Sequence, residues 1–226
     1  VCGLIVVEDF GTAVFVALIS FVILAIAGVR WWHVLTLLPF AGGGLVVGLI
    51  HSPHRIKRLL AFLRPEEWAD VAYQANQSLI AIGSGGLWGK GLGQGICKHG
   101  HLPEDTTDFI FAIVGEELGL IGTIGVIGLF VVFVGLGWVV VMRCRDRFGR
   151  LLAAGIVLTI SIQAAINIGV VTVVLPTKGI PLPFISSGGT SMLLSAAAVG
   201  VLLNIASQTD RGDSDMCDRA DGDSDV

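Results

Sequence analysis

Charged residues are scarce in this sequence. Asp, Glu, Lys and Arg make up 14% of its 226 residues, whereas about 25% is usual in a soluble domain. Hydrophobic residues make up 54% of the chain, and the mean hydropathy is +0.83. Because these residues are gathered in blocks long enough to cross a bilayer, the composition excludes an ordinary soluble domain. It predicts an all-α fold, a polytopic bundle of transmembrane helices.

Motifs for metals and nucleotides are also missing. The four cysteines are isolated, and the pairs His51/His54 and His99/His101 are not interpreted as metal ligands, so neither a disulfide framework nor a structural metal is expected. The glycine-rich segment 80–95 has neither the G-x-G-x-x-G nor the P-loop pattern. We interpret it as a loop whose free amides could cradle phosphate or sugar oxygens. The chain begins with Val1 without a leader pattern, so we expect its N-terminal part to be missing.

The apolar runs divide the chain into a transmembrane domain, residues 1–207, and a tail. Residues 208–226 contain seven Asp and almost no apolar side chains, which predicts a disordered acidic tail. The polar, glycine-rich residues 51–107 are predicted to form a large loop. Spanning helices are predicted at about 11–28, 33–50, 109–142, 151–175 and 191–207.

Positive charge sets the predicted orientation of these helices. Four Arg crowd residues 143–150, and short loops rich in Lys and Arg stay in the cytoplasm. Alternation of the spans then places the acidic tail in the cytoplasm as well. The large loop 51–107 and the segment 176–190 are predicted to lie together on the extracellular face.

The apolar run 109–142 is too long for a simple span. At about 1.5 Å per residue it would extend about 51 Å, whereas the hydrocarbon core is roughly 30 Å thick. Counting back from the cytoplasmic end places Glu116 and Glu117 near the outer boundary. The helix is therefore predicted to project into an extracellular cavity with Asp108 at its N-terminus. Glycines at helical spacing predict a stripe for close helix packing, made of Gly115, Gly119, Gly122, Gly125 and Gly128.

Two charged positions each allow two interpretations. Thr107 or Asp108 is a natural N-cap, since such a side chain accepts orphan backbone N–H bonds. Alternatively, Asp108 is a carboxylate at the mouth of a cavity, available as a general base. Lys178 either snorkels from the outer interface or neutralises a diphosphate as a point charge. Glu116 and Glu117 either pair with Lys178 or only mark the boundary.

Two further segments indicate how the chain meets the membrane. Residues 176–191 are rich in Pro, Gly and Ser and lie between two apolar runs. Backbone this irregular must be packed in protein or face water, because lipid cannot satisfy its amides and carbonyls. Residues 51–64 mix cations with apolar side chains, which predicts an amphipathic interfacial helix, with or without attraction to anionic lipid phosphate.

Several motifs, in this order along the chain, resemble the FtsW/RodA/SpoVE family of bacterial cell division, elongation and sporulation proteins. The resemblance covers nearly the whole chain except the acidic tail, and it implies the C-terminal half of a ten-helix member. The matching segments are 8–12, 73–74 with 77–79, 82–86 with 89–95, 102–104 with 107–111, 116–119 and 167–191.

The resemblance implies a peptidoglycan glycosyltransferase that polymerises lipid II, an undecaprenyl-diphosphate-linked disaccharide peptide, in division or elongation. In the family, the residue matching Asp108 is the essential acid, proposed to deprotonate the acceptor hydroxyl. Cations are expected to stabilise the leaving diphosphate. The residues expected to bind substrate are Lys178, Arg55, Arg58, Glu104, Ser186, Gly188 and Gly189.

The resemblance also implies a cofactor, partners and a location. A divalent cation, Mg²⁺ or Mn²⁺, could share in neutralising the diphosphate. The expected partners are lipid II, the membrane and a class B penicillin-binding protein, which is a transpeptidase; no nucleic acid is expected. The expected location is the bacterial inner membrane, with the active site on its outer face. Two alternatives stand beside the enzyme: a lipid II flippase that uses the same cavity without chemistry, and a non-catalytic scaffold for the transpeptidase.

Overall fold

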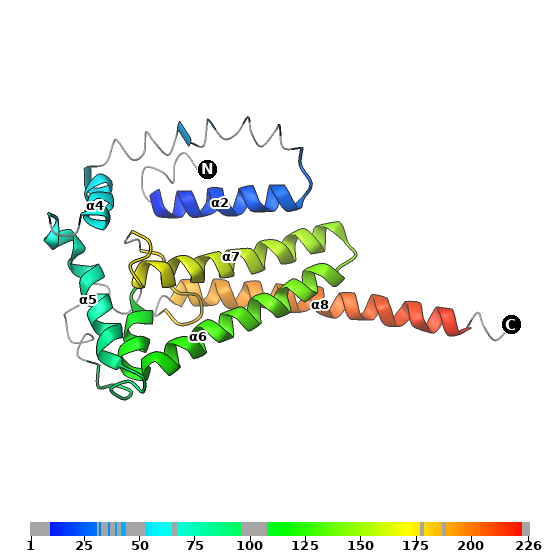
Figure 1. Cartoon of the computed structure of the whole chain (residues 1–226). Helices are drawn as coiled ribbons and strands as arrows, with labels where there is room; N and C mark the ends of the chain where they lie inside the picture. The colour runs from blue at the N-terminus through cyan, green and yellow to red at the C-terminus, as the bar shows by residue number, and fades with distance from the viewer. Residues whose placement is uncertain are drawn as a thin grey trace.

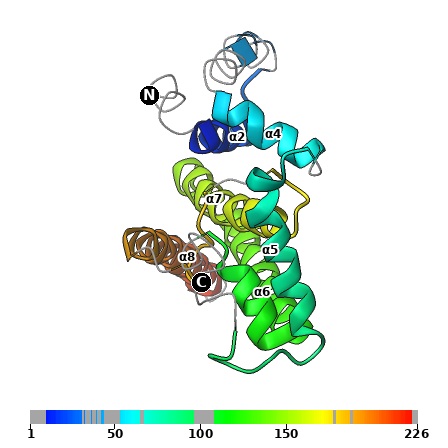
Figure 2. The ribbon, with the colours of Figure 1, turned by 90° about the vertical axis from the view of Figure 1, so that its left-hand side faces the viewer.

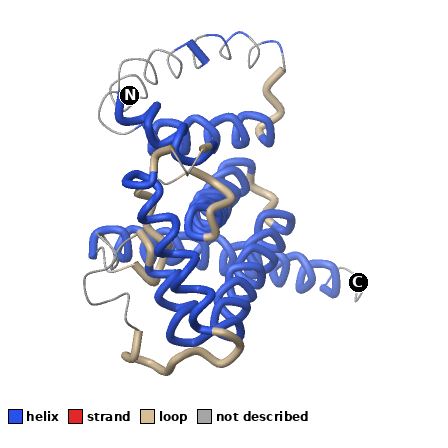
Figure 3. The backbone as a smooth tube through the Cα atoms, turned by 60° about the vertical axis from the view of Figure 1, so that its left-hand side comes forward, coloured by secondary structure: helices blue, strands red, loops and turns tan. Residues whose placement is uncertain are grey.

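The protein is helical throughout the ranges that its structure, a computed structural model, describes. No strand occurs in these ranges (Figure 3), which confirms the predicted all-α fold. The described residues are 10–30, 32, 36, 39, 42–43, 53–64, 67–95, 108–176, 179–186 and 189–222. The helices are α2 (Phe10–Ile26), α4 (Pro53–Leu63), α5 (Ala69–Gly85), α6 (Ile110–Arg143), α7 (Arg147–Val171) and α8 (Gly189–Gly222).

Long apolar helices form the main bundle. Among the described residues, three stretches are long and apolar enough to cross a membrane: Ile110–Arg143, Arg147–Val171 and Gly189–Thr209. Helix α2 is apolar but shorter, and it lies along α7 (Figure 1). These helices make the chain a multi-pass membrane protein. Of the predicted span 33–50, only isolated positions are described, so that span stays a prediction.

One end of the bundle carries the arginine-rich turn between α6 and α7, and we call it the Arg-rich end. Asp146 caps α7 there, because its Oδ2 accepts a 2.7 Å hydrogen bond from the amide of Gly149. An acid at this position satisfies an amide that the first turn of a helix leaves unbonded. Small and branched side chains of α6, α7 and α8 pack beneath the turn, among them Val141, Ala153 and Leu202.

Two helices lie at the opposite end, which we call the Asp108 end: α4, which confirms the helix predicted within residues 51–64, and α5, which the sequence did not predict. The segment 51–107 was predicted as a large loop, but it contains α4 and α5, and α5 lies across the end of the bundle (Figure 2). Polar residues made α5 look like a loop, yet some of them are buried. The hydroxyl of Ser78 is fully buried and donates to the carbonyl of Val171 at 2.9 Å. Residues 80–85, predicted as glycine-rich loop, are the last turns of this helix.

Helix α8 extends further than the sequence predicts. It continues to Gly222, beyond the other helices at the Arg-rich end (Figure 1), whereas residues 208–226 were predicted to be disordered. The difference has a physical cause, because a helix that is already nucleated adds one hydrogen bond for each residue it fixes.

The most irregular feature of the bundle is a break in α6 at Gly119. This residue has φ 67° and ψ −161°, a conformation that glycine tolerates and other residues rarely adopt. The loop after α5 fills the break. The amides of Lys90 and Gly91 donate to the carbonyls of Glu116 and Glu117, each at 3.0 Å. These amides are therefore bonded within the protein, and the prediction that the glycine-rich loop offers free amides to phosphate is wrong at these positions.

The predicted stripe of glycines serves packing along only part of its length. A Cβ at Gly115 would lie 3.0 Å from the side chain of Ile82, which shows a close contact between α5 and α6. Gly119 forms the break. At Gly125 and Gly128 an added Cβ would meet no described atom within 4 Å. Close helix packing is thus confirmed at the Asp108 end of the stripe only.

Candidate active site

Asp108 lies half-buried at the start of α6, at the end of the bundle opposite the Arg-rich turn. The helix begins at Ile110, and Phe109 occupies the N-cap position. The expectation that Asp108 is the N-cap is therefore wrong by one residue, and Thr107 lies outside the described residues. Phe109 is 4% exposed and packs in the same buried cluster as Leu182. This packing fixes the backbone next to Asp108.

Asn167 joins the backbone of Asp108 to the irregular loop that precedes α8. Its Nδ2 donates to the carbonyl of Asp108 at 2.8 Å and to the carbonyl of Ile180 at 2.7 Å. Asn167 lies in the last turns of α7 and is 1% exposed. Its own Oδ1 has no hydrogen-bond partner in the described part of the chain. Both amide protons of this buried side chain therefore hold together two segments that are far apart in sequence.

Gly179 brings the same loop close to the Asp108 side chain. A Cβ added at Gly179 would lie 2.8 Å from Oδ2 of Asp108 and 3.7 Å from its Cγ. Real Cβ atoms essentially never approach another atom that closely. The absence of a side chain at this position therefore leaves the room that the carboxyl group occupies.

The rest of the loop is packed in protein. Leu182 is fully buried, Pro183 lies beside it in the interior, and Gln163 of α7 donates from Nε2 to the carbonyl of Pro181 at 2.9 Å. Ser186 is 5% exposed, and its hydroxyl has no hydrogen-bond partner among the described residues. The prediction that this irregular backbone must be packed in protein is confirmed for residues 180–183. Burial places the Ser186 hydroxyl away from the surface.

The described members of the predicted substrate-binding set, Arg58, Ser186 and Gly189, lie on separate elements. Arg58 is exposed on α4, which packs against α5 alone among the described helices. Gly189 begins α8 and faces open space. Arg55 lies on α4, but its side chain is not described. The predictions for Lys178, Glu104 and Gly188 fall outside the described residues.

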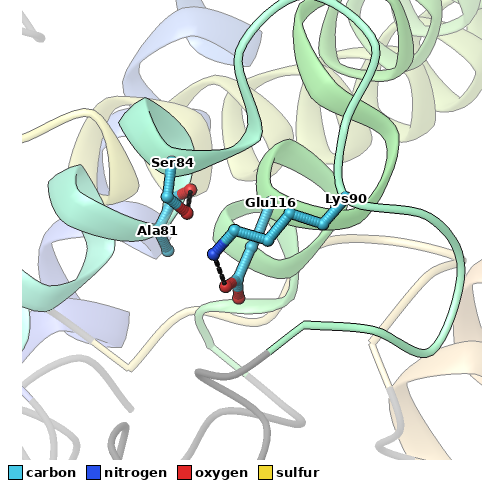
Figure 4. Close-up of polar contacts among 4 residues, drawn as sticks. All are labelled: Ala81, Ser84, Lys90 and Glu116. Carbon is cyan, nitrogen blue, oxygen red and sulfur yellow. Dashed lines mark hydrogen bonds and ion pairs between the residues drawn. The ribbon is translucent and has the colours of Figure 1, made fainter.

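The two glutamates of α6 lie at the break, against the loop after α5. Glu116 is 1% exposed, and its Oε1 pairs with Nζ of Lys90 at 2.7 Å (Figure 4). Glu117 is 8% exposed, and its Oε1 has no hydrogen-bond partner in the described ranges. Lys90 comes from the loop that fills the break, so this ion pair ties the loop to α6. The predicted alternative in which the glutamates only mark a boundary is wrong for Glu116.

No described group of three His, Cys, Asp or Glu side chains converges in a way that could hold a metal ion. Few protein ligands would be needed by an ion bound mainly to a substrate diphosphate, since Mg²⁺ keeps several waters and substrate oxygens among its ligands.

Sequence reasoning missed the residues that position Asp108. Asn167 entered the sequence analysis only as the first residue of a segment that matches the family, and Gly179 only as part of the irregular loop. Gln163 was not considered. A signal for the two amides was present, because they stand four residues apart in an otherwise apolar helix and so lie on one face. Polar side chains inside a membrane helix usually have a bonding partner or a function.

These features define a class of protein: a multi-pass helical membrane protein that holds a carboxyl group beside a packed, irregular loop at one end of its bundle. Comparison with known proteins agrees with this class. The sequence model of the FtsW/RodA/SpoVE family, described as "Cell cycle protein", matches residues 1–211. The chain belongs to the FtsW/RodA/SpoVE family.

Individual relatives give the same result. The chain is 46% identical to the probable peptidoglycan glycosyltransferase FtsW of Coxiella burnetii, over 92% of this chain and 57% of the relative. It is 44% identical to the FtsW of Trichlorobacter lovleyi that carries the same description, over 88% of this chain and 52% of the relative. The chain thus spans about half the length of the curated relatives it matches.

A solved structure shares the fold. It is described as "Structural coordination of polymerization and crosslinking by a peptidoglycan synthase complex" and superposes with a TM-score of 0.69 at 25% identity. The match covers 91% of this chain and 58% of the other.

Proposed function

We propose that the protein from which this chain comes is a peptidoglycan glycosyltransferase that polymerises lipid II, with Asp108 as its general base. The observation that carries the proposal is the support given to Asp108: Asn167 holds its backbone and Gly179 leaves room for its carboxyl group. A general base must be held within hydrogen-bond reach of the proton it removes. The names of relatives at 43–46% identity support the same activity.

In the proposed reaction the carboxylate of Asp108 accepts the proton of the acceptor sugar hydroxyl. The hydroxyl oxygen forms a bond to the anomeric carbon of the second lipid II molecule. The bond from that carbon to the phosphate oxygen breaks, and undecaprenyl diphosphate leaves with the electron pair. Lys178, Arg55 and Arg58 are proposed to stabilise the charge that develops on the diphosphate. A divalent ion bound to the diphosphate would add positive charge at the same place.

The setting of the reaction is also a proposal. The Arg-rich turn is expected in the cytoplasm, which puts Asp108 on the outer face of the inner membrane, where lipid II is polymerised. A class B penicillin-binding protein is the proposed partner. The solved complex, whose description names both polymerization and crosslinking, supports a transpeptidase in this place.

The test uses the purified whole protein and labelled lipid II. Wild type is expected to make glycan strands, and Asp108→Asn is expected to lower kcat by about 10²- to 10⁴-fold, the usual contribution of a general base. Strand synthesis at the wild-type rate by Asp108→Asn would overturn the mechanism. If wild type makes no strands but moves lipid II across liposomes, the flippase alternative is right.

A further inference from the structure

The loop that fills the break in α6 presents an apolar surface. Leu87, Trp88 and Leu92 are 63%, 82% and 75% exposed, and we call these three side chains the loop patch. The loop itself is firmly held, since its backbone bonds to α6 and Lys90 pairs with Glu116. Large apolar side chains on a fixed loop indicate a surface that something apolar covers.

The break in α6 defines the depth of the loop patch. From Leu120 to Arg143 the helix rises about 35 Å at about 1.5 Å per residue, slightly more than the hydrocarbon thickness of about 30 Å. Arg143 belongs to the Arg-rich turn, whose charges stay out of hydrocarbon. The break therefore lies just beyond the opposite face of the hydrocarbon. The loop is bonded there, because the carbonyls of Gly86 and Leu87 accept from the amides of Leu120 and Ile121, at 2.9 and 3.4 Å.

Exposed apolar side chains also lie on α6 next to the loop. Leu120, Ile121 and Ile124 are 49%, 54% and 59% exposed, and they occupy the first turns of the segment that spans the membrane. Exposed apolar side chains on a spanning helix, beside a tryptophan at the boundary, are typical of contact with lipid, since Trp concentrates at the membrane interface.

We propose that the loop patch inserts into the boundary between headgroups and acyl chains of the bilayer at the Asp108 end. It acts as an anchor that fixes the height of the break. The residues of α6 before the break, and with them Asp108, are then held at a constant distance above the lipid. This proposal depends on the depth of the loop and not on the chemistry of Asp108, so either can fail without the other.

The experiment measures what surrounds the loop patch in vesicles of phosphatidylcholine and phosphatidylglycerol. The whole protein, with its native cysteines changed to Ser, carries a nitroxide label on Leu92→Cys. Electron paramagnetic resonance then compares collisions with oxygen, which concentrates in lipid, and with a water-soluble nickel chelate. Leu129→Cys, a position 71% exposed in the middle of spanning α6, is the lipid reference. Gln94→Cys, exposed on the same loop, is the water reference.

The oxygen-to-nickel ratio at Leu92→Cys is expected to be severalfold higher than at Gln94→Cys and close to that at Leu129→Cys. A ratio equal to that at Gln94→Cys would show that water surrounds the patch and would overturn the proposal. Low collision rates with both reagents would overturn it too, because they would show that another protein surface covers the patch.

A second measurement needs no cysteine changes. Lipids brominated on the upper acyl chain quench nearby tryptophans, and the contribution of Trp88 is the difference between wild type and Trp88→Phe. Trp138→Phe gives the matching difference for a tryptophan on spanning α6. Quenching of Trp88 by brominated lipid is expected; quenching by aqueous acrylamide alone, or by neither reagent, contradicts the anchor.

Discussion

Replacing Asn167 by Leu should separate the position of Asp108 from its chemistry. Leucine has the branched skeleton of asparagine, although it is bulkier, and it cannot donate a hydrogen bond. The substitution therefore removes both bonds from Nδ2, to the carbonyls of Asp108 and Ile180, without opening a large cavity. It does not change the side chain of Asp108 itself. We expect a folded protein in which the start of α6 and the loop before α8 are no longer joined.

The size of the effect follows from burial. A buried polar group that loses its partner costs about 1–3 kcal/mol, and a carbonyl with a second lone pair falls at the low end of that range. Two carbonyls then cost about 2–4 kcal/mol of stability. Leucine also removes the unbonded Oδ1 of Asn167, which offsets part of this loss. A displacement of Asp108 by about 1 Å would lower the rate by about 10²-fold.

The assay measures kcat and KM for strand synthesis, together with the melting temperature in detergent. Gln163→Leu is the matched control, because Gln163 stands one turn earlier on the same helix and binds the same loop through Pro181. Both variants should lose stability. We expect kcat to fall about 10²-fold for Asn167→Leu and less than tenfold for Gln163→Leu, at a temperature where both are folded.

Equal losses of kcat in Asn167→Leu and Gln163→Leu would refute the reasoning, since the loop and not Asp108 would then limit the rate. Full activity of Asn167→Leu would refute it as well. Asn167→Asp gives an independent check. It keeps the shape of the side chain but puts an oxygen where the donor was, so it should lose activity as Asn167→Leu does.

Two further predictions concern glycines. Gly179→Ala places a Cβ 2.8 Å from the Asp108 carboxyl group and should lower kcat for strand synthesis more than tenfold. Gly200→Ala, whose Cβ faces open space in the described structure, is the control and should keep the wild-type kcat. A fully active Gly179→Ala would contradict the prediction. Gly119→Ala puts a Cβ 2.4 Å from a backbone nitrogen of the loop after α5 at a positive φ, so it should lower the melting temperature by several degrees and cost about 2 kcal/mol or more. The control is Gly125→Ala, whose Cβ would meet nothing described within 4 Å, and it should leave the melting temperature unchanged or raise it. If Gly119→Ala and Gly125→Ala lowered the melting temperature equally, a side chain at the break would cause no special strain.

The sequence allowed the bundle to be predicted because membrane helices depend on a simple rule. The hydrocarbon must be crossed by apolar residues in helical form, and the predicted spans 109–142 and 151–175 correspond closely to α6 and α7. The rule does not apply outside the hydrocarbon. Helix α5 there is partly polar, and its fit to the bundle depends on tertiary contacts such as the bond from Ser78 to Val171. The same reasoning missed the break at Gly119, because a glycine that breaks a helix and a glycine that packs in one look alike in sequence.

The candidate site was half predictable for a related reason. Asp108 was found because an acid beside a long apolar run is unusual and because its motif resembles a family. Asn167 and Gly179 contribute through contacts with Asp108 from 59 and 71 positions further along the chain, and a spacing of that kind has no local pattern. Only the fold shows that the end of α7 and the loop before α8 meet the start of α6.

The way Asn167 binds has a consequence for the decisive experiment on function. Its Nδ2 bonds to the backbone carbonyl of Asp108 and not to the carboxyl group, so the bond should survive any substitution of the Asp108 side chain. Phe109 is buried next to it, and that packing is also independent of the side chain. Asp108→Asn should therefore melt within a few degrees of wild type while it loses strand synthesis. A large fall in melting temperature would instead mean that the carboxyl group supports the fold, and the loss of activity could not then be assigned to proton transfer.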